Sequence, residues 1–412
     1  MFQLIIDRLR QRHFWRRATF NELSALYVSE LMREIAKNLA MVFIYAFLFT
    51  KGYSLFYLAT FAIYHRLMML IFGVFSMFLV AFFGAKKCLI VGNFFYVPSL
   101  LMFAIFDQWG ELAVALGGLL IAFASEIHRT SYNVLFSEVK NAQNSGKEIS
   151  YMLIFQKIAG IISPFLGGWL ASYFGAESSM FFAAILYLIA AISFVKTPAQ
   201  SKRHHNLNFK TFPWRSYRSI FFGQFGRGFD AVAADFWSLF VAIFILSGAA
   251  TYGIVGSLKS LDAFVIFMLA FFLGRALDKQ HRMTTRSFRL GVVLTSCSFI
   301  FQPLLLTLPG AIISEIIYSI GTILYHIPYT KARYDAADQS GSRVLMELMM
   351  TIVSGISAVM AGLILLACLR LIPDQRMAFI VFFVICGFAN LIFAFSNFPI
   401  FRAYKYHQAD IA

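Results

Sequence analysis

Long, uninterrupted apolar runs restrict the fold of this chain more than any other feature of its sequence. They recur along its whole length, as in 54–83 and 342–370. A helix of about 20 apolar residues crosses the hydrocarbon core of a bilayer, whereas the strands of a membrane barrel alternate apolar and polar residues over about 10 positions. The runs therefore predict an all-α integral membrane protein.

Composition agrees with this fold class. Of the 412 residues, 60% are hydrophobic and 13% are charged, which leaves too few charges to cover the surface of a soluble protein. The net charge of +15 would suit nucleic-acid binding, but the excess Lys and Arg lies in short segments between apolar runs. That distribution orients membrane helices, so we expect no nucleic-acid partner. The four cysteines lie in or beside apolar runs without CxxC spacing and are interpreted as small apolar residues.

Breaks that contain charges, Gly or Pro divide the chain into twelve segments of helical length. We predict transmembrane helices at 22–50, 54–83, 87–106, 110–137, 149–173, 177–196, 217–247, 250–274, 286–307, 309–334, 342–370 and 375–397. The connecting segments are alternately rich and poor in Lys and Arg. By the positive-inside rule both termini face the cytoplasm of a cell membrane, as an even number of spans also requires. No cleavable signal peptide is expected, because the short N-terminal block LII is followed by five arginines.

The twelve spans divide into two groups of six. The predicted parts are a basic cytoplasmic segment, a six-helix bundle, a cytoplasmic linker, a second six-helix bundle and a cytoplasmic tail, at 1–21, 22–196, 197–216, 217–397 and 398–412. The basic segment lies along the inner membrane surface or forms a solvated tail, and both interpretations stay open. His204 and His205 in the linker have no third ligand nearby, which favours a solvated linker over a metal site.

The two groups share a pattern of small residues. Ser145-Gly146 in the first group matches Ser340-Gly341 in the second, and the same spacing aligns two further glycine pairs, Gly160 with Gly355 and Gly167 with Gly362. One spacing that matches several small residues favours an internal duplication. Two parallel six-helix repeats are typical of one large class of transporters.

The stretch GRALDKQHRM begins as the eighth predicted helix ends, and it carries Gly274, Asp278, Lys279 and Arg282. It resembles the loop signature of the major facilitator superfamily. The resemblance implies twelve helices in two pseudo-symmetric bundles, with these residues acting as a cytoplasmic gate that favours the outward-open state. The alternative, an ordinary positive-inside loop, leaves Asp278 unexplained. The stretch FFGAKKCLIVG in the first half keeps Gly84 but has no Asp, so the resemblance implies a gate in one half only.

A second resemblance concerns the stretch GIISPFLGG, which carries Gly160, Pro164, Gly167 and Gly168. It is similar to the glycine-proline motif of antiporters in the same superfamily, although Ser163 stands where those members have Gly. The resemblance implies proton-coupled efflux. Small residues at this spacing also serve helix packing in general, and that interpretation stays open.

Charged side chains at membrane depth cost roughly 3 kcal/mol or more, so each asks for a partner or a function. The resemblance implies that the first, fourth, seventh and tenth helices line a cavity. We expect substrate contacts from Lys37, Arg66, Glu126, Arg129, Lys157 and His326, and proton coupling from Asp230, Asp235 and Asp262, with Glu126 as a further carrier. The alternative is structural ion pairing, along Glu30–Arg33–Glu34–Lys37 and between Arg227 and Asp230. Likewise, Tyr325 and Tyr329 either stack on a ligand or pack as ordinary aromatics.

The leading functional hypothesis is a secondary active transporter that moves a small polar or anionic solute, or a drug-like compound, by proton-coupled alternating access. A lipid flippase or scramblase on the same fold is the alternative. An integral membrane enzyme is disfavoured, because His65, His128 and His326 are single residues on separate helices. The GxxxxGK[ST] pattern is absent, so direct use of ATP is not expected. We expect no cofactor and no metal, and a monomer whose partners are the solute, the coupling proton and membrane lipid.

Overall fold

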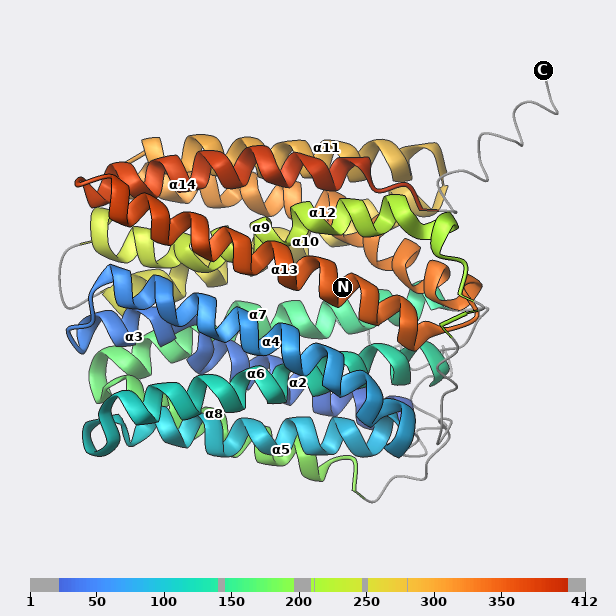
Figure 1. Cartoon of the computed structure of the whole chain (residues 1–412), viewed down its shortest axis with the longest axis horizontal. Coiled ribbons are helices and arrows are strands. Elements are labelled where there is room, and N and C mark those ends of the chain that lie inside the picture. Colours follow the sequence, from blue (N-terminus) through green and yellow to red (C-terminus); the bar gives the residue numbers. More distant parts are fainter. Residues whose placement is uncertain are drawn as a thin grey trace, which may run out of the picture.

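The computed structural model describes residues 22–139, 145–195, 209–210, 212–246, 251–279 and 281–398. The predicted N-terminal basic segment, His204 and His205, and all but the first residue of the predicted C-terminal tail lie outside this part. Along the described part, the regular elements are helices (Figure 1). The main ones are α2 (Glu22–Ala40), α3 (Ile44–Thr50), α4 (Leu55–Phe83), α5 (Ala85–Ala104), α6 (Phe106–Val139), α7 (Ser145–Phe174), α8 (Ala176–Ile192), α9 (Trp214–Phe240), α10 (Thr251–Lys279), α11 (His281–Phe301), α12 (Leu308–Gln339), α13 (Arg343–Leu371) and α14 (Gln375–Asn390).

These helices confirm the predicted all-α fold class. Within the described residues, nine are long and apolar enough to cross a membrane, and the shorter α8 is also apolar. The protein is therefore a multi-pass membrane protein. The number of crossings and their grouping into two bundles stay predictions.

The helix boundaries follow local chain chemistry. Gly84 and Gly175 have φ values of 87° and 84°, in a region that favours glycine, and each immediately precedes a helix. Gly110, with φ 52°, interrupts α6 where the fourth span was predicted to begin. One prediction was wrong: the first span is not one helix, because a 3-10 turn at Met41–Phe43 separates α2 from α3. No Gly or Pro in the turn explains that break.

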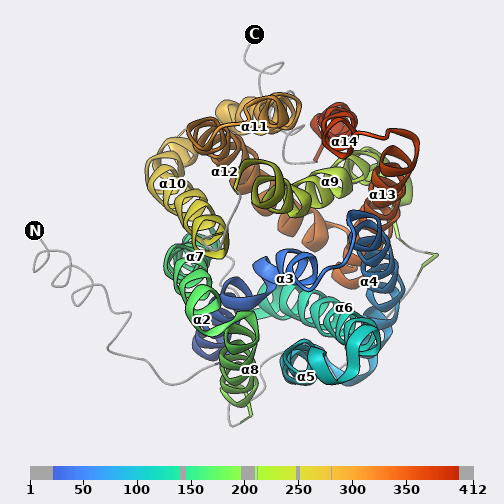
Figure 2. The same ribbon diagram turned by 90° about the vertical axis from the view of Figure 1, so that its left-hand side faces the viewer.

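Two pairs of helices that are far apart in sequence pack along opposite flanks of the molecule. α7 lies beside α10, and α4 lies beside α13 (Figure 2). The α7–α10 contact is unusually close, because a Cβ atom at Gly256 would overlap the carbonyl oxygen of Pro164. A Cβ atom at Gly168 would meet the carbonyl oxygen of Tyr252 in the same way. Small residues thus let two backbones touch.

Large apolar side chains also cover the outside of the helices. On α4, Phe75, Phe78 and Phe82 are exposed, and on α8 Phe181 and Phe182 are exposed as well. An exposed apolar surface of this extent suits hydrocarbon rather than water. The interior holds aromatic clusters, such as the one that Phe236, Phe240, Phe379 and Phe383 form between α9 and α14.

Candidate functional site

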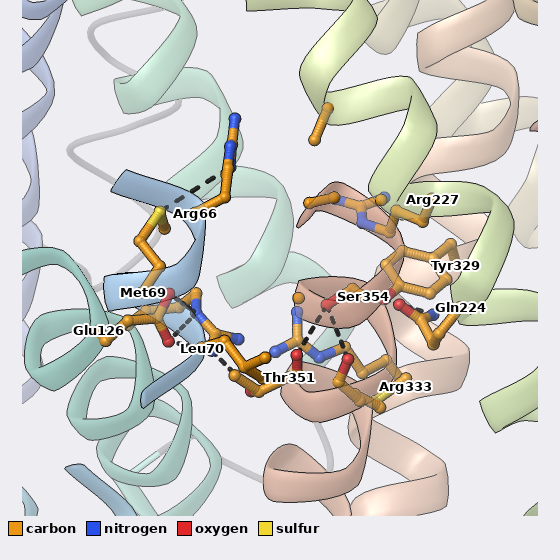
Figure 3. A pocket seen from close by; sticks show the side chains of 16 residues that line it. Arg66, Met69, Leu70, Glu126, Gln224, Arg227, Tyr329, Arg333, Thr351 and Ser354 are labelled. Atoms are coloured by element: carbon orange, nitrogen blue, oxygen red, sulfur yellow. Dashed lines mark hydrogen bonds and ion pairs between the residues drawn. The ribbon is translucent and has the colours of Figure 1, made fainter. Parts of the chain in front are cut away.

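A cavity of about 180 Å³ lies between α4 and α6 on one side and α9, α12 and α13 on the other (Figure 3). Its walls are unusually basic for the interior of a membrane protein. The polar residues that line it are Arg66, Glu126, Arg129, Gln224, Arg227, Tyr329, Arg333, Thr351 and Ser354. Four of these nine are arginines, so the partners of each guanidinium decide what the cavity can bind.

Arg129 is held by a carboxylate on its own helix. Its Nε donates to both carboxylate oxygens of Glu126, at 3.3 and 3.2 Å, and its Nη2 also pairs with this group. The same Nη2 donates to Thr351 Oγ1 on α13 at 2.6 Å. Gly73 on α4 makes room for this pair, because a Cβ atom there would lie 2.9 Å from Glu126 Oε2. Arg129 therefore links α6 to α13 across the cavity.

Arg66 is held by a carboxylate from a distant helix. Its Nη2 forms an ion pair with Asp235 Oδ2, which joins α4 to α9. Its Nη1 approaches the sulfur of Met69 at 3.8 Å. The Arg66 side chain is mostly buried, whereas the Asp235 side chain is 41% exposed.

Arg333 of α12 pairs with an almost completely buried carboxylate on α13. Its Nε donates to Glu347 Oε1 at 2.8 Å, and its Nη2 pairs with Glu347 Oε2. Glu347 also accepts from Asn133 Nδ2 of α6 at 3.1 Å, and Tyr334 OH donates to Asn133 Oδ1 at 3.2 Å. This polar cluster ties the ends of α6, α12 and α13 together beside the cavity.

Arg227 differs from the other three. Its guanidinium lies 4.7 Å from the centre of the Tyr329 ring and 5.9 Å from that of Phe393. Its Nη1 is buried, and no described residue accepts a hydrogen bond from it. The nearby carboxylate of Asp230 instead accepts from Tyr325 OH at 3.1 Å and from Tyr318 OH at 3.4 Å.

The predicted substrate contacts fall into two groups. Arg66, Glu126 and Arg129 line the cavity, whereas Lys37, Lys157 and His326 are not among its lining residues. Lys37 binds Glu34 on its own helix at 3.3 Å, and His326 Nδ1 lies 3.4 Å from Thr330 Oγ1. Their roles in substrate binding stay predictions.

The predicted proton carriers occupy three separate environments. Asp235 pairs with Arg66 and Asp230 with two tyrosines, while Asp262 accepts from Ser319 Oγ at 2.5 Å. Close to Asp262, the buried Glu315 accepts from Lys259 Nζ at 3.0 Å and from Trp237 Nε1 at 2.9 Å. The role of each of the three as a proton carrier stays a prediction.

Glu30 and Arg33 of α2 belong to a largely buried network outside the cavity lining. Glu30 accepts from Arg33 Nη2 at 2.7 Å and from Gln156 Nε2 at 2.9 Å, and it lies 3.1 Å from His128 Nε2. His128 Nδ1 in turn meets Asn93 Oδ1 at 2.9 Å. This arrangement favours the structural interpretation of these ion pairs over substrate contact.

The gate and packing residues can be placed only in part. The predicted gate residues Gly274, Asp278 and Lys279 fall in α10 and Arg282 falls in α11, but their side chains lie outside the described part. The four packing residues, Gly160, Pro164, Gly167 and Gly168, all lie in α7. A Cβ atom at Gly167 would overlap the Leu39 backbone, and one at Gly160 would lie 3.1 Å from Ala263 Cβ.

The sequence matches the family model of the Major Facilitator Superfamily over residues 26–353. The chain belongs to the Major Facilitator Superfamily. This superfamily member is accordingly a secondary transporter rather than an enzyme.

Solved structures share the fold of this superfamily member at low identity. A POT family transporter in complex with 5-aminolevulinic acid is 11% identical, with a TM-score of 0.71 over 90% of this chain and 94% of that one. A peptide transporter POT in complex with sulfate is 12% identical, with a TM-score of 0.70 over 93% and 94%. A mutant of the peptide transporter POT, in complex with alafosfalin, is 13% identical, with a TM-score of 0.66 over 96% of each chain. No curated protein matches the sequence.

Several cavity residues of this superfamily member were not among the substrate contacts predicted from the sequence. Arg333 falls at the edge of a predicted span and reads as part of a basic loop, whereas α12 continues to Gln339 and carries Arg333 along the cavity. Arg227 stands three residues before Asp230 and was interpreted as its possible ion-pair partner. Thr351 and Ser354 carry no charge, so only the helix contacts reveal them.

Proposed function

We propose that this protein is a secondary active transporter that moves a small polar or anionic solute by alternating access between two six-helix halves, 22–196 and 217–397. The observation that carries the proposal is the basic cavity, because helices from both proposed halves line it. Arg129 reaches Thr351, and Arg66 reaches Asp235, from one half to the other. A site shared by two halves is open to opposite sides in turn when they rock around it.

The packing of aligned glycines supports a repeat of two halves. Gly160 and Gly355, which share one position of the repeat, lie in α7 and α13. Gly160 faces Ala263 of α10, and Gly355 faces Leu70 of α4. Each glycine therefore meets a helix of the opposite half, and the two contacts occupy the two opposite flanks.

Contacts between the proposed halves occur near both ends of the bundle, which is what an alternating-access cycle needs. Near one end, Thr50 Oγ1 lies 2.8 Å from Tyr252 OH. Near the other, Asn133 Nδ2 donates to Glu347 at 3.1 Å. Opening either end requires that one set of contacts breaks while the other holds.

The coupling ion in this proposal is a proton, and Asp235 is its first candidate carrier, with Asp230 and Asp262 as the others. Protonation of Asp235 would remove its charge and break its ion pair with Arg66, which is a contact between the two halves. Arg66 itself lines the cavity. The proposal includes efflux, both termini on the cytoplasmic side of the cell membrane, and a monomer in contact with lipid.

Transport by purified protein in liposomes tests this function. Solutes that raise the unfolding temperature of the protein are selected first, since a ligand that binds the native state stabilises it. Each is then followed across the liposome membrane with and without a pH gradient. We expect the pH gradient to drive movement of at least one solute through the wild-type protein. In Asp235→Asn the movement of that solute should no longer depend on the gradient. If no solute moves while labelled lipid crosses the bilayer, the protein is a lipid scramblase and the proposal fails.

A further inference from the structure

The four cavity arginines are unequally compensated. Arg66, Arg129 and Arg333 each pair with a carboxylate, namely Asp235, Glu126 and Glu347 respectively. For Arg227 the described residues supply no such partner: its Nη1 is buried without an acceptor, and Asp230 is engaged by two tyrosines. We propose that Arg227 is the receptor for an anionic group, a carboxylate or a phosphate, of the transported solute. This inference rests on the proposed function, because it names the substrate class of the same cavity.

The surroundings of Arg227 hold the guanidinium in place, but no described residue accepts a hydrogen bond from its buried Nη1. The ring of Tyr329 lies against it at 4.7 Å, and Gln224 Nε2 fixes that ring by donating to Tyr329 OH at 3.0 Å. An aromatic face attracts a cation but supplies no oxygen to accept from its N–H groups. A buried N–H group without an acceptor is unfavourable, and a ligand oxygen at this point would remove that penalty.

The packing of α9 places Arg227 opposite the polar wall of the cavity. The next residue, Gly228, touches α13 so closely that a Cβ atom there would overlap Ser357 and the carbonyl oxygen of Ser354. In Figure 3, Arg227, Tyr329 and Gln224 stand on one side, and Arg66 and Glu126 on the other. A solute held by Arg227 through its anionic end therefore faces Thr351 and the Arg129–Glu126 pair with its remaining atoms.

The chemistry of the receptor and the size of the cavity restrict the solute further. A guanidinium is planar and presents parallel N–H groups that match two oxygens of a carboxylate or phosphate, a geometry that a lysine cannot reproduce. The volume of about 180 Å³ is below the roughly 300–1,000 Å³ of pockets that take drug-sized ligands. Small anionic metabolites fit these two conditions, and bulky drug-like compounds do not.

Binding of simple anions to the full-length protein tests the inference. The probes are inorganic phosphate and acetate, each compared with chloride at equal ionic strength, and phosphatidylglycerol added to the detergent micelle. The variants are Arg227→Gln, which removes the charge, and Arg227→Lys, which keeps the charge but not the paired N–H groups. Arg370→Gln is the matched control, because Arg370 is an exposed arginine at the end of α13, outside the cavity.

We expect phosphate or acetate to stabilise the wild-type protein and Arg370→Gln equally. In Arg227→Gln the dissociation constant rises about tenfold to a hundredfold, as expected when a hydrogen bond to a charged group is lost. Arg227→Lys loses part of the affinity. Equal affinity in wild type and both Arg227 variants overturns the inference, and so does stabilisation by phosphatidylglycerol alone. If Arg227→Gln does not fold, as judged by its elution profile, the comparison of Arg227→Lys with wild type decides.

The transport assay separates this inference from the proposed function. If wild-type protein transports only neutral or cationic solutes, the anion receptor is wrong and the transporter stands. If phosphate binds in an Arg227-dependent way but no solute crosses the liposome membrane, the transporter proposal is wrong and the anion site stands.

Discussion

Arg66 of α4 forms an ion pair with Asp235 of α9, a residue 169 positions later in the chain. Arg66 lines the cavity and the pair joins the two proposed halves, so the strength of the pair bears on stability and on transport together. With 41% of the Asp235 side chain exposed, water reaches one partner. An ion pair of this kind contributes modestly, because solvent screens it.

The first prediction therefore concerns the coupling between these two residues. Arg66→Gln and Asp235→Asn should each lower the free energy of unfolding, and the double variant should lose less than the sum of the two. We expect a coupling energy of about 1 kcal/mol or less. Denaturant unfolding of the four proteins measures it. Fully additive losses would mean that the two side chains do not interact in the purified protein.

The second prediction concerns Glu347, whose side chain is almost completely buried between Arg333 and Asn133. Glu347→Gln leaves the Arg333 guanidinium without its carboxylate, so the free energy of unfolding should fall by about 3 kcal/mol. Arg333→Gln combined with Glu347→Gln removes both charges and should restore part of that loss. Thermal unfolding of the three proteins decides, and a double variant less stable than Glu347→Gln would contradict the pairing.

The third prediction concerns the close contact of α7 with α10. Gly256→Ala introduces a Cβ atom at the Pro164 carbonyl oxygen, which is backbone and cannot rotate away. We expect a loss of about 1–3 kcal/mol in stability, typical of overpacking, together with slower transport. Gly253→Ala is the matched control on the same helix, because its nearest neighbour, Ser172 Oγ, would be 3.7 Å away. Equal behaviour of the two variants would show that the contact is looser than described.

The fourth prediction concerns pH and lies outside the membrane-spanning helices. Lys51, between α3 and α4, donates to Asp107 at 2.7 Å and pairs with Glu177 at 2.8 Å. Partial burial lowers the pKa of Lys51, but the hydrogen bonds to the two carboxylates outweigh it, so the net pKa lies above its ordinary value. The stabilisation is thus complete below the ordinary pKa of about 10.5 and disappears as the pH rises through the raised value.

Lys51→Met should therefore unfold at a lower temperature than wild type at pH 8, and the difference should shrink as the pH rises above 10. The expected loss in the free energy of unfolding is below about 1 kcal/mol for each ion pair, because Asp107 is largely exposed. Unfolding temperatures measured across this pH range test it. A constant difference at every pH would assign the effect to packing of the lysine stem.

Hydropathy located the helices well, because the length of an apolar run reports directly on the bilayer that it crosses. The predicted span 54–83 corresponds to α4 at Leu55–Phe83, and 342–370 to α13 at Arg343–Leu371. The same reasoning missed the turn at Met41–Phe43, since the sequence there has no residue that interrupts a helix. It also ended the tenth span at 334, near Arg333, because polar residues that face a cavity resemble a loop when read along the chain.

The cavity was only partly predictable, for a different physical reason. Charge at membrane depth singled out Arg66, Glu126 and Arg129, all of which line it. It could not distinguish them from Lys37 or Lys157, because the cost of a buried charge says that a partner is needed but not which one. Thr351 and Arg227 join the site through contacts between distant helices, and those contacts are set by packing that no single segment encodes.

The glycine contacts along α7 and α10 have a mechanical consequence. At Gly168 and Gly256 one backbone rests directly on another, with no interlocking side chains between them. Two helices in such contact can change their relative orientation without a change of side-chain rotamer, whereas interdigitated side chains would fix that orientation. In the proposed alternating-access cycle, the contact between α7 and α10 can therefore act as a pivot that persists while the ends of the two halves separate.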